Sequence, residues 1–139
     1  MKNYLPIYAN ASKLRSMGNA YIVRSLEKAG LKGIVPSHGD VMNLLFRKGI
    51  CNMTELAQEV RRTKSTMTVL VDKLEREGYV SKKTDPDDSR GVLVELTAKG
   101  RALEPVFQDI SDGLNELIAD RLSKEEIDQL NALLQKCVD

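Results

Sequence analysis

Residues 63–78 have the sequence TKSTMTVLVDKLEREG, and this stretch decides the fold. Its apolar residues Met67, Leu70, Val71 and Leu74 recur at spacings of three and four, which predicts a helix with one narrow apolar side. The other side carries Ser65, Thr66, Thr68, Val69, Asp72, Lys73 and Arg76. Short hydroxyl side chains followed by basic ones have the size and chemistry that fit the major groove of DNA.

A shorter helix is predicted directly before this one. Asn52 is a good N-cap, and Glu55 three residues later completes a capping box. The connector at 61–63 is short, and Thr63 can cap the next helix. Two short helices joined by so tight a turn must cross steeply, which is the helix-turn-helix arrangement.

The pattern changes after Gly78, a residue that favours the left-handed end of a helix. Residues 79–84 and 91–96 alternate with a period of two and indicate two strands, while 85–90 are rich in turn-forming residues. A β-hairpin directly after a helix-turn-helix predicts a winged helix.

Five short motifs carry a family resemblance. They are TELA at 54–57, STMT at 65–68, VDKLEREGYV at 71–80, DPDDSR at 85–90 and LTAKG at 96–100. With these motifs the chain resembles the MarR (multiple antibiotic resistance regulator) family of bacterial transcriptional regulators over nearly its whole length. Two residues depart from the pattern: Ser89 stands where the family often has a second basic residue, and Arg61 where many such turns have glycine.

The resemblance implies roles for the wing and a mode of regulation. Arg90 would enter the minor groove at the wing tip, and Asp88 would support the wing by pairing with a nearby arginine. A small aromatic or anionic effector would bind between the dimer helices and the winged domain and release the DNA. Repression is the family's usual mode of action.

The residues of the helix-turn-helix suggest a division of labour at double-stranded DNA. Ser65, Thr66 and Thr68 are placed to contact base edges, and Val69 can meet a thymine methyl group. Contacts with phosphates are expected from Arg61, Arg62, Lys64, Lys73 and Arg76. Asp72 would repel phosphate, so we interpret it as an ion-pair partner within the protein.

Amphipathic helices are predicted on both sides of the winged helix. The first covers 1–29, with Ile7, Ala11, Leu14, Gly18 and Tyr21 on its apolar side, and a second runs from Pro36 to about Lys48. Thr97 can cap the helix that follows the wing, in which Pro105 predicts a kink or a delayed start. Ser123 and Glu126 form a capping box for the last helix, whose Ile127, Leu130, Leu133 and Leu134 are expected to face inward.

These helices have more apolar surface than one small module can cover, so we predict a homodimer. The expected fold is mainly α with a small β wing, in which 1–139 form one MarR-type domain. Within it, 36–97 would be the winged helix-turn-helix lobe, and 1–30 and 98–139 the dimerisation helices.

Composition limits the classes of function. With 139 residues, 42% of them hydrophobic and 29% charged, the chain has the make-up of an ordinary soluble protein, and a cytoplasmic location is expected. Residues 61–83 hold seven basic and three acidic side chains, whereas 104–139 hold three basic and nine acidic ones. One histidine and two separated cysteines offer no catalytic triad or metal set, so we expect neither an enzyme nor a cofactor.

Three residues leave alternatives open. His38 and Ser37 lie where an effector crevice is expected, although a lone histidine near a helix end is more often a cap or a surface group. Cys51 is a candidate thiol sensor, with a buried and inert cysteine as the favoured interpretation, and Cys137 is expected to pack in the tail. The competing function is a winged-helix module that binds proteins, which would need an apolar or acidic exposed face.

Overall fold

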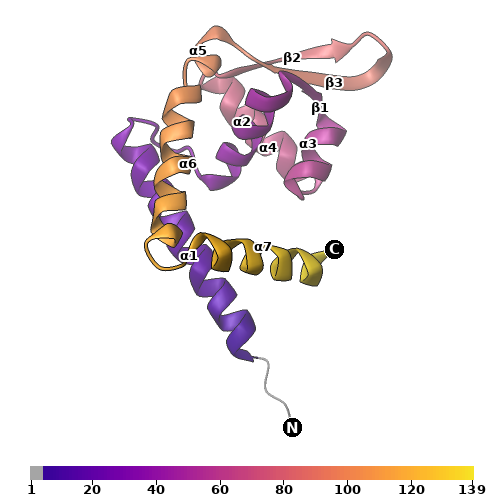
Figure 1. The fold of residues 1–139 in the computed structure, drawn as a ribbon. Helices are drawn as coiled ribbons and strands as arrows, with labels where there is room; N and C mark the ends of the chain where they lie inside the picture. The colour runs from indigo at the N-terminus through magenta and orange to yellow at the C-terminus, as the bar shows by residue number, and fades with distance from the viewer. Residues whose placement is uncertain (1–4) are drawn as a thin grey trace.

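The computed structural model describes residues 5–139, so the first four residues of the expected N-terminal helix lie outside its description. The elements in chain order are α1 (Leu5–Lys28), α2 (Pro36–Lys48), β1 (Ile50–Asn52), α3 (Met53–Val60), α4 (Lys64–Arg76), β2 (Val80–Asp85), β3 (Asp88–Leu96), α5 (Ala98–Arg101), α6 (Glu104–Ala119) and α7 (Lys124–Val138). This confirms the prediction of a mainly helical chain with a winged helix-turn-helix at its centre (Figure 1).

The predicted helix starts are confirmed by their caps. The Asn52 Oδ1 accepts a hydrogen bond from the Glu55 amide at 2.7 Å, and the Thr63 Oγ1 accepts one from the Thr66 amide at 3.2 Å. These bonds satisfy backbone donors that the first turn leaves free. Pro105 lies in the first turn of α6, which begins at Glu104 and not directly after Thr97. Of the two expectations for this proline, a kink or a delayed start, the delayed start is the one found.

The wing differs from the prediction in two ways. It is a three-stranded antiparallel sheet in the order β1-β3-β2, because residues 50–52 pair with β3 and form a strand that was not predicted. Three residues are too few to show alternation in a sequence. The turn is also shorter than the six residues predicted, because β2 continues to Asp85 and β3 begins at Asp88, with an irregularity in the pairing at Thr84 and Asp85.

The core lies among α2, α3 and α4, beneath the sheet. Met67, Leu70, Val71 and Leu74 of α4 are all buried, as their spacing predicts. They pack in one cluster with buried residues of the neighbouring elements, among them Val41, Met42, Leu44, Leu45, Leu56 and Val94. Each such side chain contributes roughly 1.5–3 kcal/mol on burial, so the orientation of α4 is set by its apolar side.

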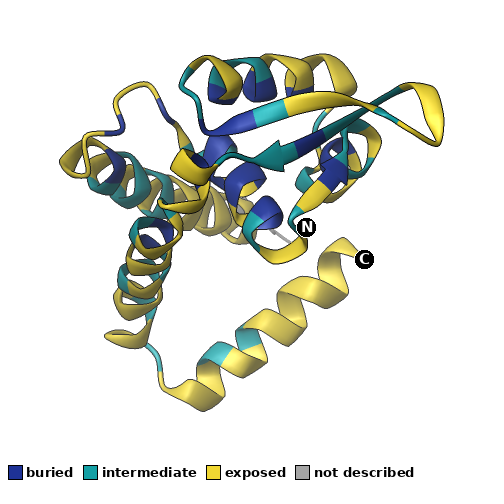
Figure 2. Ribbon diagram, turned by 90° about the horizontal axis from the view of Figure 1, so that it is seen from above, coloured by how far each residue is buried: buried dark blue, intermediate teal, exposed yellow. Residues whose placement is uncertain are grey.

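The flanking helices cover little of their apolar surface within one chain. α6 runs beside α1, and the centroids of Phe46 in α2 and Phe107 in α6 lie 5.6 Å apart, which joins α6 to the lobe (Figure 1). α7 has no buried residue, and Figure 2 shows it almost entirely exposed. Leu133 and Leu134 are 60% and 43% exposed, so the expected inward face of α7 is not found within the chain.

Two further observations concern the chain as a whole. Cys137 near the end of α7 is exposed and is not packed, which corrects the expectation for that residue, since α7 has no neighbour there to cover it. None of the helices between residues 5 and 139 is long and apolar enough to span a membrane.

Candidate nucleic-acid interface

The side of α4 that faces away from the core is exposed and carries the predicted hydroxyl residues. Ser65, Thr66 and Thr68 are exposed, and Val69 is 67% exposed although it is apolar. The Thr68 Oγ1 donates to the Lys64 carbonyl oxygen at 2.9 Å, and the Thr63 Oγ1 donates to the Thr66 Oγ1 at 3.1 Å. The hydroxyls of Thr66 and Thr68 are therefore oriented by the first turn of the helix and its cap, while both residues remain exposed to a ligand.

The basic residues of the motif divide into two groups. Arg61, Lys64 and Arg76 are exposed. The Arg62 guanidinium is turned inward: its Nη1 donates to the Arg61 carbonyl oxygen at 3.1 Å and its Nη2 to the Ser37 Oγ at 3.4 Å. In the conformation of this structure, only the exposed side chains of Arg61, Lys64 and Arg76 can extend toward a phosphate.

Lys73 belongs to the inward group with Arg62. Its Nζ pairs with Glu77 at 3.2 Å and lies beside Gly33, in the loop between α1 and α2. Contacts with phosphates by Arg62 and Lys73 stay predictions that would require these side chains to move.

The tip of the wing places Arg90 in the open. Its side chain is exposed, and its backbone amide donates to the Asp88 Oδ1 at 3.0 Å. Asp88 therefore supports the wing through the backbone of the turn. Among residues 5–139 it forms no ion pair with an arginine, which corrects that part of the expectation; its Oδ1 accepts the Arg90 amide within the turn instead.

The wing and the start of α4 share a hollow. Arg90 of β3 and Lys64 of α4 line one cavity of about 210 Å³, together with the first residues of α3. Asp85 and Asp88 line it as well, so its charge is mixed. This hollow brings the wing arginine and the exposed start of α4, at Lys64, to one side of the molecule.

The interpretation of Asp72 as an ion-pair partner is confirmed. Its Oδ1 lies 2.6 Å from the Lys82 Nζ, and the Glu75 Oε1 lies 3.5 Å from the same atom. Lys82 of β2 was not singled out from the sequence. The sequence pattern does indicate its position, because residues two apart in a strand point to the same face, so Lys82 shares the face of the buried Val80.

His38 acts as a cap at the start of α2. It is buried, and its Nδ1 accepts a hydrogen bond from the Val35 amide at 2.9 Å. Burial lowers the pKa of His38, and the nearby Lys73 ammonium lowers it further. The neighbouring Ser37 lines a crevice of about 380 Å³ with Arg15, Asp40 and Arg62, but His38 is not among the residues that line it.

The environment of Cys51 is the opposite of that of a reactive thiol. Its side chain is 1% exposed, and burial raises its pKa, as does the Glu55 carboxylate. This confirms that Cys51 is buried, and its inertness stays a prediction that the raised pKa favours. Within residues 5–139 no group of His, Cys, Asp and Glu side chains is arranged to hold a metal ion.

Comparison with known proteins gives this site its context. The model of the MarR family matches residues 34–92, the part that contains the helix-turn-helix and most of the wing. The uncharacterised HTH-type transcriptional regulator YkoM of Bacillus subtilis is 31% identical over 104 residues, which cover 75% of this chain and 68% of YkoM. The chain belongs to the MarR family of transcriptional regulators.

Solved structures show that this MarR-family chain has the fold of its relatives along nearly its whole length. A MarR transcriptional regulator from Methanosarcina mazei has a TM-score of 0.83 and 27% identity, and the match covers 94% of this chain and 92% of that one. A mutant of MarR from Escherichia coli, solved in complex with operator DNA, has a TM-score of 0.87 and 23% identity, with 96% and 94% covered.

Proposed function

We propose that this MarR-family regulator is a repressor that binds a pseudo-palindromic DNA operator as a homodimer and is released by a small molecule. The observation that carries the proposal is the exposed hydroxyl face of α4 on the same side of the molecule as the exposed Arg90 of the wing. A helix of this kind fits the major groove, and an arginine-tipped hairpin fits the neighbouring minor groove. The operator complex of the E. coli relative supports this assignment.

Within the proposed interface the contacts follow from exposure. Ser65, Thr66 and Val69 are the side chains of α4 that can reach base edges, with Thr68 beside them. Lys64, Arg61 and Arg76 are placed to hold phosphates, which set the register without reading the sequence.

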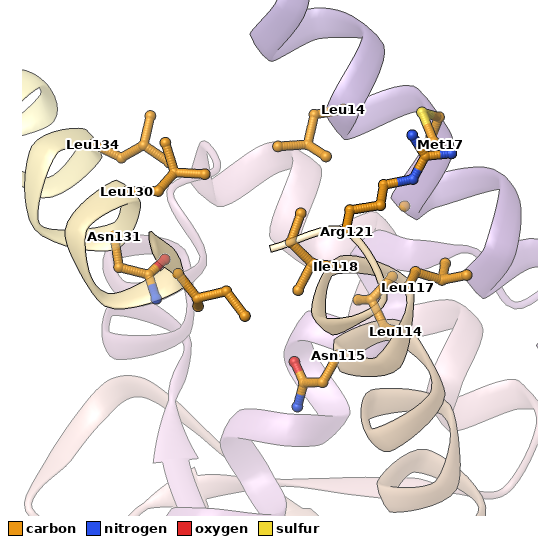
Figure 3. Close-up of a pocket in the computed structure, with 12 residues that line it drawn as sticks. Leu14, Met17, Leu114, Asn115, Leu117, Ile118, Arg121, Leu130, Asn131 and Leu134 are labelled. Carbon is orange, nitrogen blue, oxygen red and sulfur yellow. The ribbon is translucent and has the colours of Figure 1, made fainter. Parts of the chain in front are cut away.

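Dimerisation is proposed from the uncovered apolar side chains of the flanking helices. Figure 3 shows Leu14 of α1, Ile118 of α6 and Leu130 of α7 directed toward one hollow of about 340 Å³. Exposed apolar patches of this kind mark interfaces in soluble proteins. We therefore assign 36–97 to the DNA-binding lobe and 1–30 with 98–139 to the dimer. A two-fold dimer of this kind would bind half-sites about one turn of DNA apart.

The crevice between α1, α2 and the helix-turn-helix turn is the proposed effector site. Arg15 and Arg62 line it together with Asp40, so two positive charges face one negative charge and the crevice would attract an anion, and Ser37 offers a hydroxyl group. Because Arg62 also holds the turn that precedes α4, an anion bound to its guanidinium would compete with the bond to Ser37 and shift that turn. An aromatic carboxylate has the charge and size for this crevice.

The DNA-binding proposal is tested by the salt dependence of operator binding. The operator is first obtained by selecting genomic fragments with the purified protein. Binding of the labelled duplex is then measured by fluorescence anisotropy over a series of salt concentrations for the wild type and Arg90→Ala. We expect weaker binding and a plot of log K against log salt that is shallower by about one unit, because one phosphate-neutralising charge is lost.

Arg24→Ala is the control, since it removes the same charge from an exposed position on α1, away from α4 and the wing. It should leave both affinity and slope unchanged. Duplex binding without salt dependence in the wild type would contradict the proposal and favour the competing module that binds proteins.

A further inference from the structure

Lys82 occupies an inward-facing position at the base of the wing. In the register of β2 and β3, Val80 lies opposite Leu96 and Lys82 opposite Val94. Residues opposite each other point to the same face of a sheet, and Val94 is fully buried on the face that covers the core. Lys82 therefore points toward α4, at the edge where the core ends, and its side chain remains 31% exposed.

The Lys82 ammonium forms ion pairs with two carboxylates of α4. The Lys82 Nζ lies 2.6 Å from the Asp72 Oδ1 and 3.5 Å from the Glu75 Oε1. The hydrogen bond that the Lys82 ammonium donates to the Asp72 carboxylate raises the pKa of Lys82, because it favours the charged form of the lysine. One cation thus joins the wing to two residues that lie about one turn apart on the helix.

The position of this bridge matters because the wing and α4 must act together. Asp72 lies one turn after Thr68 and Val69 on the exposed side of α4, and β2 leads directly from the bridge toward the wing tip. The hairpin extends beyond the core (Figure 1), and none of residues 81–93 is buried, so few side-chain contacts hold its direction. A change in the angle between β2 and α4 would move Arg90 relative to the groove that it enters.

We propose that Lys82 is a positioning residue for DNA recognition, which sets the angle between wing and α4 by bridging Asp72 and Glu75 and does not itself contact DNA. This inference rests on the proposed DNA-binding function. It names a determinant of that function outside the exposed arginines and hydroxyls of the interface.

The neighbouring Lys83 provides a matched control. It lies on the same strand, carries the same charge and points to the opposite face, where its Nζ pairs with Glu95 at 3.3 Å. Lys83→Met and Lys82→Met therefore change the net charge and the strand in the same way. Only Lys82→Met breaks the link to α4.

The test is a double-mutant cycle in operator binding with the full chain. Affinity and salt dependence are measured for the wild type, Lys82→Met, Lys82→Arg, Lys83→Met, Arg90→Ala and the double variant Lys82→Met with Arg90→Ala. We expect Lys82→Met to weaken binding about fivefold, the range that exposed ion pairs support, and Lys83→Met to change it less than about twofold. Lys82→Arg should keep the affinity within about twofold, because a guanidinium can still bridge two carboxylates.

The double variant separates positioning from direct contact. If Lys82 acts through the wing, the double variant should bind the operator almost as well as Arg90→Ala alone. Its salt slope should then be about one unit shallower than that of the wild type. If Lys82 contacts a phosphate itself, the losses add and the slope falls by about two units. That result would overturn the inference.

Asp72→Ala gives a second test, because an effect of charge alone and an effect of the Lys82 bridge change the operator affinity in opposite directions. Removing a negative charge near DNA should strengthen binding if only charge matters. The bridge predicts weaker binding, because Lys82 loses its nearer partner.

A Lys82→Met variant that melts at a lower temperature but binds the operator unchanged would also overturn the inference. Absence of salt-dependent duplex binding in the wild type would instead refute the proposed function, and the inference with it.

Discussion

Arg61 has a left-handed backbone conformation, with φ of 59°, at the end of α3. Its amide donates to the Gln58 carbonyl oxygen at 3.3 Å, so the residue closes the helix and turns the chain toward α4. Glycine adopts this conformation without the repulsion between Cβ and the carbonyl oxygen that other residues have. The helix-turn-helix geometry is therefore achieved here without the glycine that many such turns contain, at some cost in stability.

Arg61→Gly is expected to stabilise the fold. The strain that is removed exceeds the added flexibility of the unfolded chain, so the free energy of unfolding should rise by about 0.5–1 kcal/mol. Urea denaturation followed by circular dichroism measures it. Arg61→Ala is the matched control, because it loses the same side chain but keeps the Cβ. An equal gain in both variants would show that the conformation is not strained.

The buried His38 cap predicts a loss of stability in mild acid. Its pKa is lowered in the folded chain by burial and then by Lys73, so the unfolded chain, with a pKa of about 6.5, binds the proton more tightly. The contribution of His38 is therefore complete above about pH 6.5 and decreases as the pH falls toward the lowered folded pKa.

His38→Gln tests this, because an amide can accept the Val35 bond without titrating. Urea midpoints of the wild type and the variant are compared from about pH 7.5 to about pH 5.5. The wild type should lose stability relative to the variant across this range. Parallel profiles would remove His38 as the cause.

At the scale of single residues the sequence predicted caps and burial better than the directions of long side chains. The caps at Asn52, Thr63 and Ser123 depend on local spacing, and all three are present. Arg62 and Lys73 belong to the same basic run as Lys64, yet they turn toward Ser37 and Gly33. Ser37 and Gly33 lie far away in the sequence, so no local pattern could reveal them, whereas the ion pair of Lys73 with Glu77 follows from a spacing of four on a helix.

Among the elements, α5 is placed by a close approach to the wing. A Cβ built at Gly100 would overlap the carbonyl oxygen of Tyr79, a backbone atom that also accepts the Thr97 amide. Neither chain segment can move without breaking this bond or the Thr97 cap, in which the Oγ1 accepts the Gly100 amide at 3.1 Å. Gly100 therefore fixes how the chain leaves the wing for α6.

Gly100→Ala is expected to lower the free energy of unfolding by about 3 kcal/mol or more, because backbone must shift to admit the methyl group. Gly18→Ala in α1 is the control. Its Cβ would meet only Leu114 at the ordinary distance of 3.6 Å, so it should raise stability by about 0.5–1 kcal/mol through helix propensity. Thermal melts of both variants measure the difference, and equal effects would contradict the packing argument.

The prediction of elements succeeded where a pattern was long and failed where it was short. α4 was recognised from four apolar residues, and the hairpin from its alternation. β1 has only three residues and is a strand because it pairs with β3, in which Leu93 lies opposite Asn52. That pairing joins segments about forty residues apart, so no local pattern predicts it. The turn of the wing was predicted too long because Asp85 and Asp88, which are turn formers by type, pair with each other across the hairpin.

Across the whole molecule the charges and the uncovered apolar surface are segregated. The basic segment 61–83 forms α4 and the wing base, whereas the acidic segment 104–139 forms α6 and α7. Figure 1 shows α7 at the opposite end of the molecule from the wing. α7, whose first turn carries Glu125 and Glu126, therefore lies away from the wing, which favours one orientation on DNA.

Leu133→Glu is expected to disrupt the proposed dimer. Leu133 is exposed on the apolar side of α7, and a charge buried there against a second chain would have no partner. Light scattering at micromolar concentration should give twice the 15.5 kDa of one chain for the wild type and the mass of one chain for the variant. Operator affinity should fall by about a hundredfold or more, because each lobe then binds its half-site alone.

Ala132→Glu separates the loss of the interface from the added charge. Ala132 is also exposed, but its neighbouring position on the helix places it away from the apolar stripe of α7. It should retain the mass of a dimer and the affinity of the wild type. A wild-type mass of one chain would refute the proposed dimer. A Leu133→Glu variant that keeps both mass and affinity would place the dimer interface elsewhere.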